Sequence, residues 1–205
     1  MKLARAASSV SLAVGLATAV AFAAKVGAPA PAFTATDTKG TVHSLAGFKG
    51  KFVVLEWHNQ GCPYVKKHYD SANMQKLQKE WTAKGVVWLT VISSAPGKQG
   101  YVTPAEADAY VKGKSAAPTA VLLDPTGVVG LAYDAKTSPH MFIIDPAGTL
   151  VYNGAIDDKP TTDQADIATA SNFVSAALTE GMAGKAITTA TSRPYGCGVK
   201  YASGS

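Results

Sequence analysis

The sequence has few cysteines, few arginines and little net charge. Its 205 residues include 2 cysteines, Cys62 and Cys197, and arginine occurs only at Arg5 and Arg193. Without Lys2 and Arg5, which belong to the N-terminal segment, the 19 basic residues fall to 17 against 14 acidic residues, a net charge of +3. Because this excess is small and scattered along the chain, it does not indicate a surface that binds nucleic acid.

The N-terminal segment lacks a long run of strongly apolar residues. Beyond its two basic residues it is uncharged up to Ala24 and consists mostly of alanine, with serine, threonine and glycine, whereas a membrane span needs about 20 strongly apolar residues. Residues 21–23, Ala-Phe-Ala, have the small-x-small pattern of a cleavage site. We therefore predict a secretory signal peptide over residues 1–23, with a retained transmembrane anchor as the alternative.

Removal of this segment leaves a chain of the size of one domain. We expect that domain over residues 24–186, followed by a tail over residues 187–205 that carries Cys197. The mature protein would be periplasmic or secreted, with no stable membrane span, in a compartment where disulfides persist.

Residues 51–67 join a strand, a loop and a helix, with Cys62 at the junction. Residues 52–57 are apolar except for Glu56 and include two aromatic and two β-branched side chains, which indicates a strand that is buried on both faces. Gly61 permits a sharp turn, and Pro63 suits the first turn of a helix. Unpaired backbone N–H groups and the helix dipole favour a thiolate at a helix N-terminus and lower the pKa of a cysteine there. The stretch therefore predicts a nucleophilic thiol.

Segments of strand type and of helix type alternate along the rest of the chain, which predicts an α/β fold with a mixed central sheet and helices on both faces. A turn at residues 37–40 indicates an N-terminal β-hairpin extension. Further strands are expected at residues 86–92, 119–123, 140–144 and 149–154. Helices are expected at residues 63–84, with a kink near Asp70, at residues 104–112, and from an N-cap at Asp163 through an apolar stripe that runs from Ile167 to Leu178. The lysines of the first helical region predict a solvated face: Lys66, Lys67, Lys76, Lys79 and Lys84.

The order of strand, loop, Cys-Pro and helix resembles the thioredoxin active site. Glu56 and the run Cys62-Pro63-Tyr64-Val65 align with that motif without a gap, and Val65 stands where its second cysteine would be. The mature chain as a whole resembles the peroxiredoxin-like and redoxin proteins of the alkyl hydroperoxide reductase and thiol-specific antioxidant superfamily. It is most similar to a bacterial subgroup that has its second cysteine near the C-terminus. The resemblance implies a thioredoxin-like fold and a thiol-dependent oxidoreductase that exchanges disulfides or reduces peroxides, without a cofactor.

The two cysteines are predicted to form a redox pair. Cys62 would attack a disulfide or a peroxide, and Cys197 would resolve the product, because the flanking Gly196 and Gly198 let the tail bend toward another sulfur. The alternative is a structural bond that only closes a long loop. In either reaction, an external electron donor would return the oxidised protein to the dithiol state.

The resemblance also assigns roles to residues around Cys62. Glu56 falls on the buried acid of thioredoxins, where desolvation would raise its pKa and suit it to shuttle a proton; the alternative is an edge position open to water. Pro139 falls on the cis-proline that faces the cysteine, and Ser138 before it would pair its backbone with an extended thiol substrate. Pro63 and Tyr64 complete the predicted substrate-binding set.

Two departures keep the function open. In peroxiredoxins the reactive cysteine ends a Pro-x-x-x-Thr-x-x-Cys run, and the corresponding positions here are Leu55 and Asn59. The second hypothesis is therefore a non-catalytic periplasmic binding module of thioredoxin fold. Its Cys62 would form a structural disulfide, or would bind copper with His58 and His140, although we predict no metal site.

Overall fold

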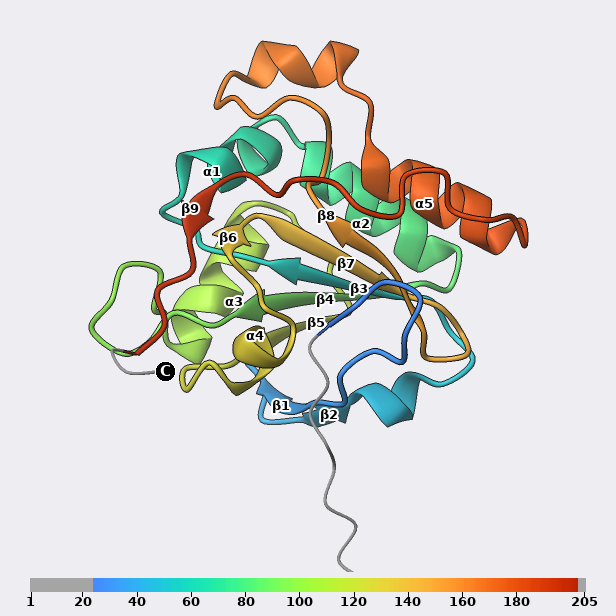
Figure 1. Ribbon diagram of the computed structural model, residues 1–205. Helices are drawn as coiled ribbons and strands as arrows, with labels where there is room; N and C mark the ends of the chain where they lie inside the picture. The colour runs from blue at the N-terminus through green and yellow to red at the C-terminus, as the bar shows by residue number, and fades with distance from the viewer. Residues whose placement is uncertain (1–23, 203–205) are drawn as a thin grey trace, which may run out of the picture.

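The computed structural model describes residues 24–202, which form an α/β fold around a seven-stranded mixed sheet of order β2-β1-β5-β4-β3-β7-β8 (Figure 1). Strands β3, β4 and β5 are parallel, and β1 and β7 run antiparallel to their neighbours β5 and β3. The sheet strands are β1 (Thr34–Asp37), β2 (Val42–Ser44), β3 (Val53–Trp57), β4 (Val87–Ile92), β5 (Ala120–Leu123), β7 (His140–Ile144) and β8 (Leu150–Gly154). The predicted mixed sheet and its N-terminal hairpin, β1 with β2, are confirmed.

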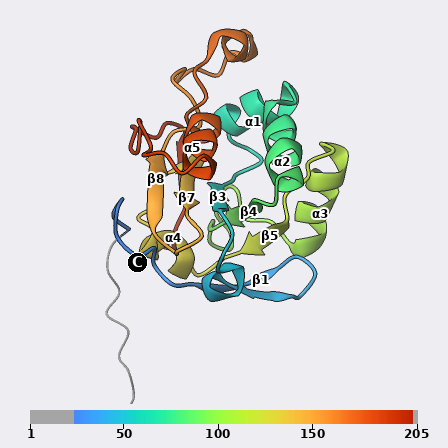
Figure 2. The same ribbon diagram turned by 90° about the vertical axis from the view of Figure 1, so that its right-hand side faces the viewer.

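Helices cover both faces of the sheet, as predicted (Figure 2). One face packs against α1, α2 and α5, and the other against α4 and the N-terminal residues 24–33. The helices are α1 (Pro63–Asp70), α2 (Asn73–Ala83), α3 (Pro104–Gly113), α4 (Val128–Ala132) and α5 (Phe173–Met182), with the short 3-10 helices η1 (Leu45–Phe48) and η2 (Gln164–Thr169). The kink expected near Asp70 is the break between α1 and α2, where Ala72 has a left-handed backbone with φ of 60°.

The last helix differs from the prediction. Asp163 caps only η2, by accepting a hydrogen bond from the Ala165 N–H at 2.9 Å. The chain is extended at Ala170, and Asn172 then caps α5 by accepting from the Ser175 N–H at 2.8 Å. The expected stripe is wrong in its first half because η2 buries none of its residues, while α5 does pack on the sheet.

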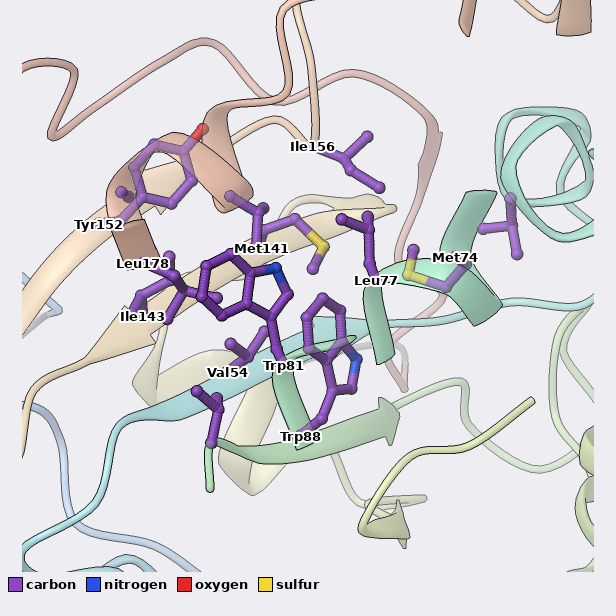
Figure 3. Packing of buried hydrophobic residues seen from close by; sticks show 14 of the residues in the cluster. Val54, Met74, Leu77, Trp81, Trp88, Met141, Ile143, Tyr152, Ile156 and Leu178 are labelled. Atoms are coloured by element: carbon purple, nitrogen blue, oxygen red, sulfur yellow. The ribbon is translucent and has the colours of Figure 1, made fainter. Parts of the chain in front are cut away.

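The larger core lies between the sheet and helices α1, α2 and α5. Met74, Leu77 and Trp81 of α2 meet side chains of β3, β4 and β7, as Figure 3 shows. The stripe predicted from these three residues is confirmed as core packing. Cys62 belongs to this core and is fully buried, at 0% exposure.

Residues 1–23, for which we predict a signal peptide, lie outside the described residues. Within residues 24–202, no helix is long and apolar enough to cross a membrane. The tail that follows α5 returns across the molecule and contains β9 (Cys197–Gly198), which pairs with the two-residue strand β6 (Thr137–Ser138) beside α1 (Figure 1).

Candidate active site

Cys62 is the N-cap residue of α1, directly before Pro63, as the sequence predicted. The loop that leads into it is held by Asn59, whose side-chain oxygen accepts from the Gly61 N–H at 2.9 Å and whose carbonyl accepts from the Cys62 N–H at 3.0 Å. The sulfur itself accepts no hydrogen bond from the first turn of α1. It donates instead to the carbonyl oxygen of Ser138 at 3.0 Å.

The peptide bond between Ser138 and Pro139 is cis, which confirms the geometry predicted for Pro139. Ser138 is buried at 3% exposure, and its backbone pairs with Cys197 in the antiparallel β6–β9 ladder. The edge that we expected an extended substrate to use is therefore occupied by the tail of the same chain. Because a substrate role for Ser138 and Pro139 requires a substrate, it stays a prediction.

Cys197 lies directly against Cys62, although the two residues are 135 positions apart in the chain. The backbone N–H of Cys197 donates to the sulfur of Cys62 at 3.4 Å, and both thiols are free. Burial, followed by the hydrogen bond and the charge interaction with Cys62, raises the pKa of the Cys197 thiol to about 11, while Lys200 acts in the opposite direction. Cys197 therefore keeps its proton at neutral pH.

Gly196 permits this close approach. Its φ is +144°, and a Cβ at this position would lie 2.1 Å from the carbonyl oxygen of Ser138. Gly198, on the other side of Cys197, has no such restriction, because the nearest atom to its added Cβ would be the Lys136 carbonyl oxygen at 3.8 Å. We predicted that both glycines let the tail bend. In the structure only Gly196 lies where a larger side chain would collide with the domain, and Gly198 does not.

Tyr64 of α1 packs against Tyr195 of the tail, with ring centroids 5.8 Å apart. Tyr195 also donates its hydroxyl hydrogen to Oδ1 of Asp157 and lies 3.3 Å from Nε2 of His68. Tyr64 therefore contacts the docked tail in this structure, and its predicted contact with substrate stays untested.

The prediction of a solvated lysine face is wrong for Lys67. It was expected on a solvated face, but it is buried at 1% exposure. Its Nζ donates to the carbonyl oxygen of Lys159 at 2.8 Å and lies 5.8 Å from the centroid of the Tyr195 ring. The buried amine is tolerated because a carbonyl and an aromatic face replace water around it.

Glu56 is buried at 1% exposure, which rules out the edge position open to water. Its carboxylate is surrounded by side-chain donors at 2.7 to 3.3 Å, namely the Tyr69 hydroxyl, Nε2 of Gln78, Nε1 of Trp88 and the Thr90 hydroxyl. Burial and the neighbouring carboxylate raise the pKa of Tyr69, so that this phenol remains a donor. Within the described residues, no hydrogen bond of Glu56 reaches either cysteine, and its proton-shuttle role stays a prediction.

The two histidines considered for copper have other partners. His140 lies 2.8 Å from Oδ1 of Asn153 through Nε2 and accepts from the Lys136 N–H at 3.2 Å through Nδ1. Burial lowers its pKa to about 4. His58 packs against the rings of Tyr69 and Tyr110, each with centroids 5.0 Å from its own. In the described part of the chain, no group of three or more His, Cys, Asp or Glu side chains is gathered for a metal.

The model of the AhpC/TSA family matches residues 26–153. The chain belongs to the AhpC/TSA family. The match includes Cys62 and the cis-proline Pro139, and it ends before the tail that carries Cys197.

Solved structures confirm the thioredoxin-like fold of this AhpC/TSA protein. A hypothetical protein from Sinorhizobium meliloti is similar at 23% identity with a TM-score of 0.74, covering 89% of this chain and 98% of its own. An uncharacterized conserved protein from Geobacillus kaustophilus has 25% identity and a TM-score of 0.73, covering 88% and 94%. A thiol:disulfide interchange protein from Bacteroides sp. has 23% identity and a TM-score of 0.51, covering 71% and 88%. No curated protein sequence matches the chain.

The sequence did not reveal the side chains that hold the tail of this AhpC/TSA member. Asp157, His68 and Lys67 are buried around Tyr195, yet none of them stands in a motif. The one available signal was the position of Tyr195 two residues before Cys197, in a tail that must reach Cys62. The partners of Tyr195 come from segments far apart in sequence, and only the fold brings them together.

Proposed function

We propose that this AhpC/TSA protein is a thiol–disulfide oxidoreductase whose redox couple is formed by Cys62 and Cys197 of one chain. The observation that carries the proposal is the contact between the Cys197 N–H and the Cys62 sulfur at 3.4 Å, in a site where both cysteines are free. A thiol at a helix N-terminus, opposite a cis-proline and beside a second thiol, is suited to accept and pass on a disulfide bond.

The reaction begins with attack by the Cys62 thiolate on one sulfur of a substrate disulfide. The substrate S–S bond breaks, one substrate thiolate leaves and takes up a proton, and a mixed disulfide joins Cys62 to the other half. Cys197 then loses its proton and attacks the Cys62 sulfur, which forms the Cys62–Cys197 bond and releases the second substrate thiol. Two electrons pass from the protein dithiol to the substrate disulfide, and an external dithiol donor must restore them.

The proposal includes export. Its support is the sequence of residues 1–23, an uncharged alanine-rich run after two basic residues with a small-x-small site. Outside the cytoplasm, a dithiol of this kind would meet disulfides and oxidants as substrates, and it would need a reductant supplied to that compartment.

The test uses the reduced protein without residues 1–23 and glutathione disulfide as the substrate. Non-reducing mass spectrometry should show the Cys62–Cys197 bond in the wild type, and Cys197→Ser should trap glutathione on Cys62. The reduction potential of the couple should lie above about −300 mV, since lower values are typical of structural bonds. A lower potential, or no bond between the two cysteines, would contradict the proposal. A rapid reaction with hydrogen peroxide but not with glutathione disulfide would identify a peroxidase instead.

A further inference from the structure

The tail crosses the domain (Figure 1), and hydrogen bonds attach it on both sides of Cys197. Before it, Ser192 joins the edge strand β8, because its N–H donates to the Asn153 carbonyl at 3.2 Å and its hydroxyl accepts from the Ala155 N–H at 2.9 Å. After it, the Val199 N–H donates to the Lys136 carbonyl at 3.0 Å. The β6–β9 ladder between these points has only two residues in each strand, which is too short to be stable alone.

Tyr195 supplies a polar attachment close to Cys197, and both of its partners are buried. Its hydroxyl donates to Asp157, which is buried at 2% exposure on the segment after β8, and lies 3.3 Å from Nε2 of the fully buried His68. His68 belongs to α1, the helix that begins directly after Cys62. Tyr195 therefore links the tail to the same helix that presents the attacked sulfur.

We propose that Tyr195 is a positioning residue of the redox couple: its bond to Asp157 and its contact with His68 hold Cys197 against Cys62. The inference rests on the proposed Cys62–Cys197 couple and adds the residue that brings the two sulfurs together. Only Gly196 separates Tyr195 from Cys197, so a fixed tyrosine leaves the cysteine little freedom.

The physical basis is effective concentration. A thiol held next to its target reacts as if it were present at a very high concentration, and a tether that loosens lowers that concentration. Without the Tyr195 hydroxyl bond, the nearest preceding hydrogen bond between the tail and the domain is that of Ser192. The same loosening would uncover Cys62, which is 0% exposed beneath the docked tail.

The experiment compares Tyr195→Phe with Tyr133→Phe in otherwise complete protein. Tyr133 is also buried, donates its hydroxyl to the Pro31 carbonyl at 2.8 Å, and packs on the other face of the sheet, so its variant controls for the loss of a buried hydroxyl. Each protein is equilibrated with known ratios of reduced and oxidised glutathione, and mass spectrometry measures the fraction that carries the Cys62–Cys197 bond. This fraction gives the effective concentration of the two thiols. The labelling rate of reduced Cys62 by iodoacetamide is measured in parallel.

Tyr195→Phe should lower the effective concentration by roughly tenfold or more, as expected for one buried bond to a charged group, and should speed the labelling of Cys62. Tyr133→Phe should leave both values within about twofold of the wild type, even if its unfolding midpoint in urea falls. If Tyr195→Phe does not fold, Asp157→Asn replaces it and the same comparison decides.

Equal values for Tyr195→Phe and the wild type, or equal losses in both tyrosine variants, would overturn the positioning role. That result is distinct from failure of the proposed function. If the wild type forms no Cys62–Cys197 bond at any glutathione ratio, the redox couple itself is wrong; if the bond forms and Tyr195→Phe leaves it unchanged, only the positioning role is wrong.

Discussion

The sulfur of Cys62 donates to the carbonyl oxygen of Ser138 at 3.0 Å and accepts from the N–H of Cys197 at 3.4 Å. One thiol thus meets both strands of the small β6–β9 ladder, because Ser138 and Cys197 face each other in it. The tail occupies the backbone edge beside the cis-proline, and Cys62 is covered while it stays there. Reaction with any bulky disulfide therefore requires the tail to leave, whereas closure of the internal disulfide requires it to return.

Gly196→Ala should prevent the tail from docking. The added Cβ would lie 2.1 Å from the Ser138 carbonyl oxygen, at a φ of +144° that alanine rarely adopts. We expect Cys62 to be alkylated faster by iodoacetamide and the internal disulfide to form more slowly, by roughly tenfold in each case. Mass spectrometry of labelled peptides against time measures both rates.

Gly198→Ala is the matched control for this prediction. It makes the same change on the other side of Cys197, where the nearest contact of a Cβ is 3.8 Å, and it should react like the wild type. Equal rates in the two alanine variants would show that docking does not depend on the close approach at Gly196.

The labelling of Cys197 should depend on pH in a way that reflects its surroundings. Its pKa is raised to about 11 by burial first and then by Cys62. The fraction of thiolate, and with it the alkylation rate, should rise about tenfold per pH unit between pH 7 and pH 10 without levelling off. In the protein unfolded by urea, the rate should stop rising once the pH passes the ordinary cysteine pKa of about 8.5. Levelling below pH 9 in the folded protein would contradict this assignment.

The fold was largely predictable because its signals are local. The buried strand before Cys62, the Gly61 turn and Pro63 determine a strand–loop–helix unit from adjacent residues, and the family resemblance added the cis geometry of Pro139. The error at the last helix also has a local cause, since Asn172 is a second cap within one apolar stripe. Local patterns did not show that Lys67 is buried, because its partner Lys159 is 92 positions away.

The tail could be predicted in part. Two cysteines and an absent partner at Val65 pointed to Cys197, and the flanking glycines suggested a bend. The sequence indicated only that the tail could bend toward Cys62, whereas the structure shows a tail that is held by Tyr195 and by the β6 edge. These contacts depend on tertiary packing between segments far apart in the chain, which no periodic pattern records.

Glu56→Gln should destabilise the protein. The carboxylate accepts from four side-chain donors in a buried site, and an amide would replace one acceptor oxygen with an N–H₂ group that faces them. We expect the free energy of unfolding to fall by about 2–3 kcal/mol, measured by urea denaturation. Glu80→Gln removes a half-exposed partner of Lys84 and should change stability by less than about 0.5 kcal/mol. Similar small effects in both variants would mean that the Glu56 network adds little to stability.

His140 should contribute to acid denaturation. Burial is the largest cause that lowers its folded-state pKa to about 4, below the ordinary value of 6.5, so the unfolded chain takes up a proton before the folded chain does. Stability from this residue is therefore present above pH 6.5 and is lost as the pH falls from 6.5 toward 4, by about 3 kcal/mol in total. Urea unfolding followed by circular dichroism at several pH values measures the slope.

The substitution that tests this is His140→Gln, which can still pair with Asn153 but cannot take up a proton. Relative to the wild type it should lose stability at pH 7, because it packs less well beside Phe142, whose ring centroid lies 4.3 Å from that of His140. Its stability should fall less steeply between pH 6.5 and pH 4, since one proton uptake on unfolding is gone. Parallel curves for the two proteins across this range would mean that His140 is not a source of the acid sensitivity. The loss of stability at low pH would then be assigned to His68. Burial also lowers the pKa of this residue to about 4.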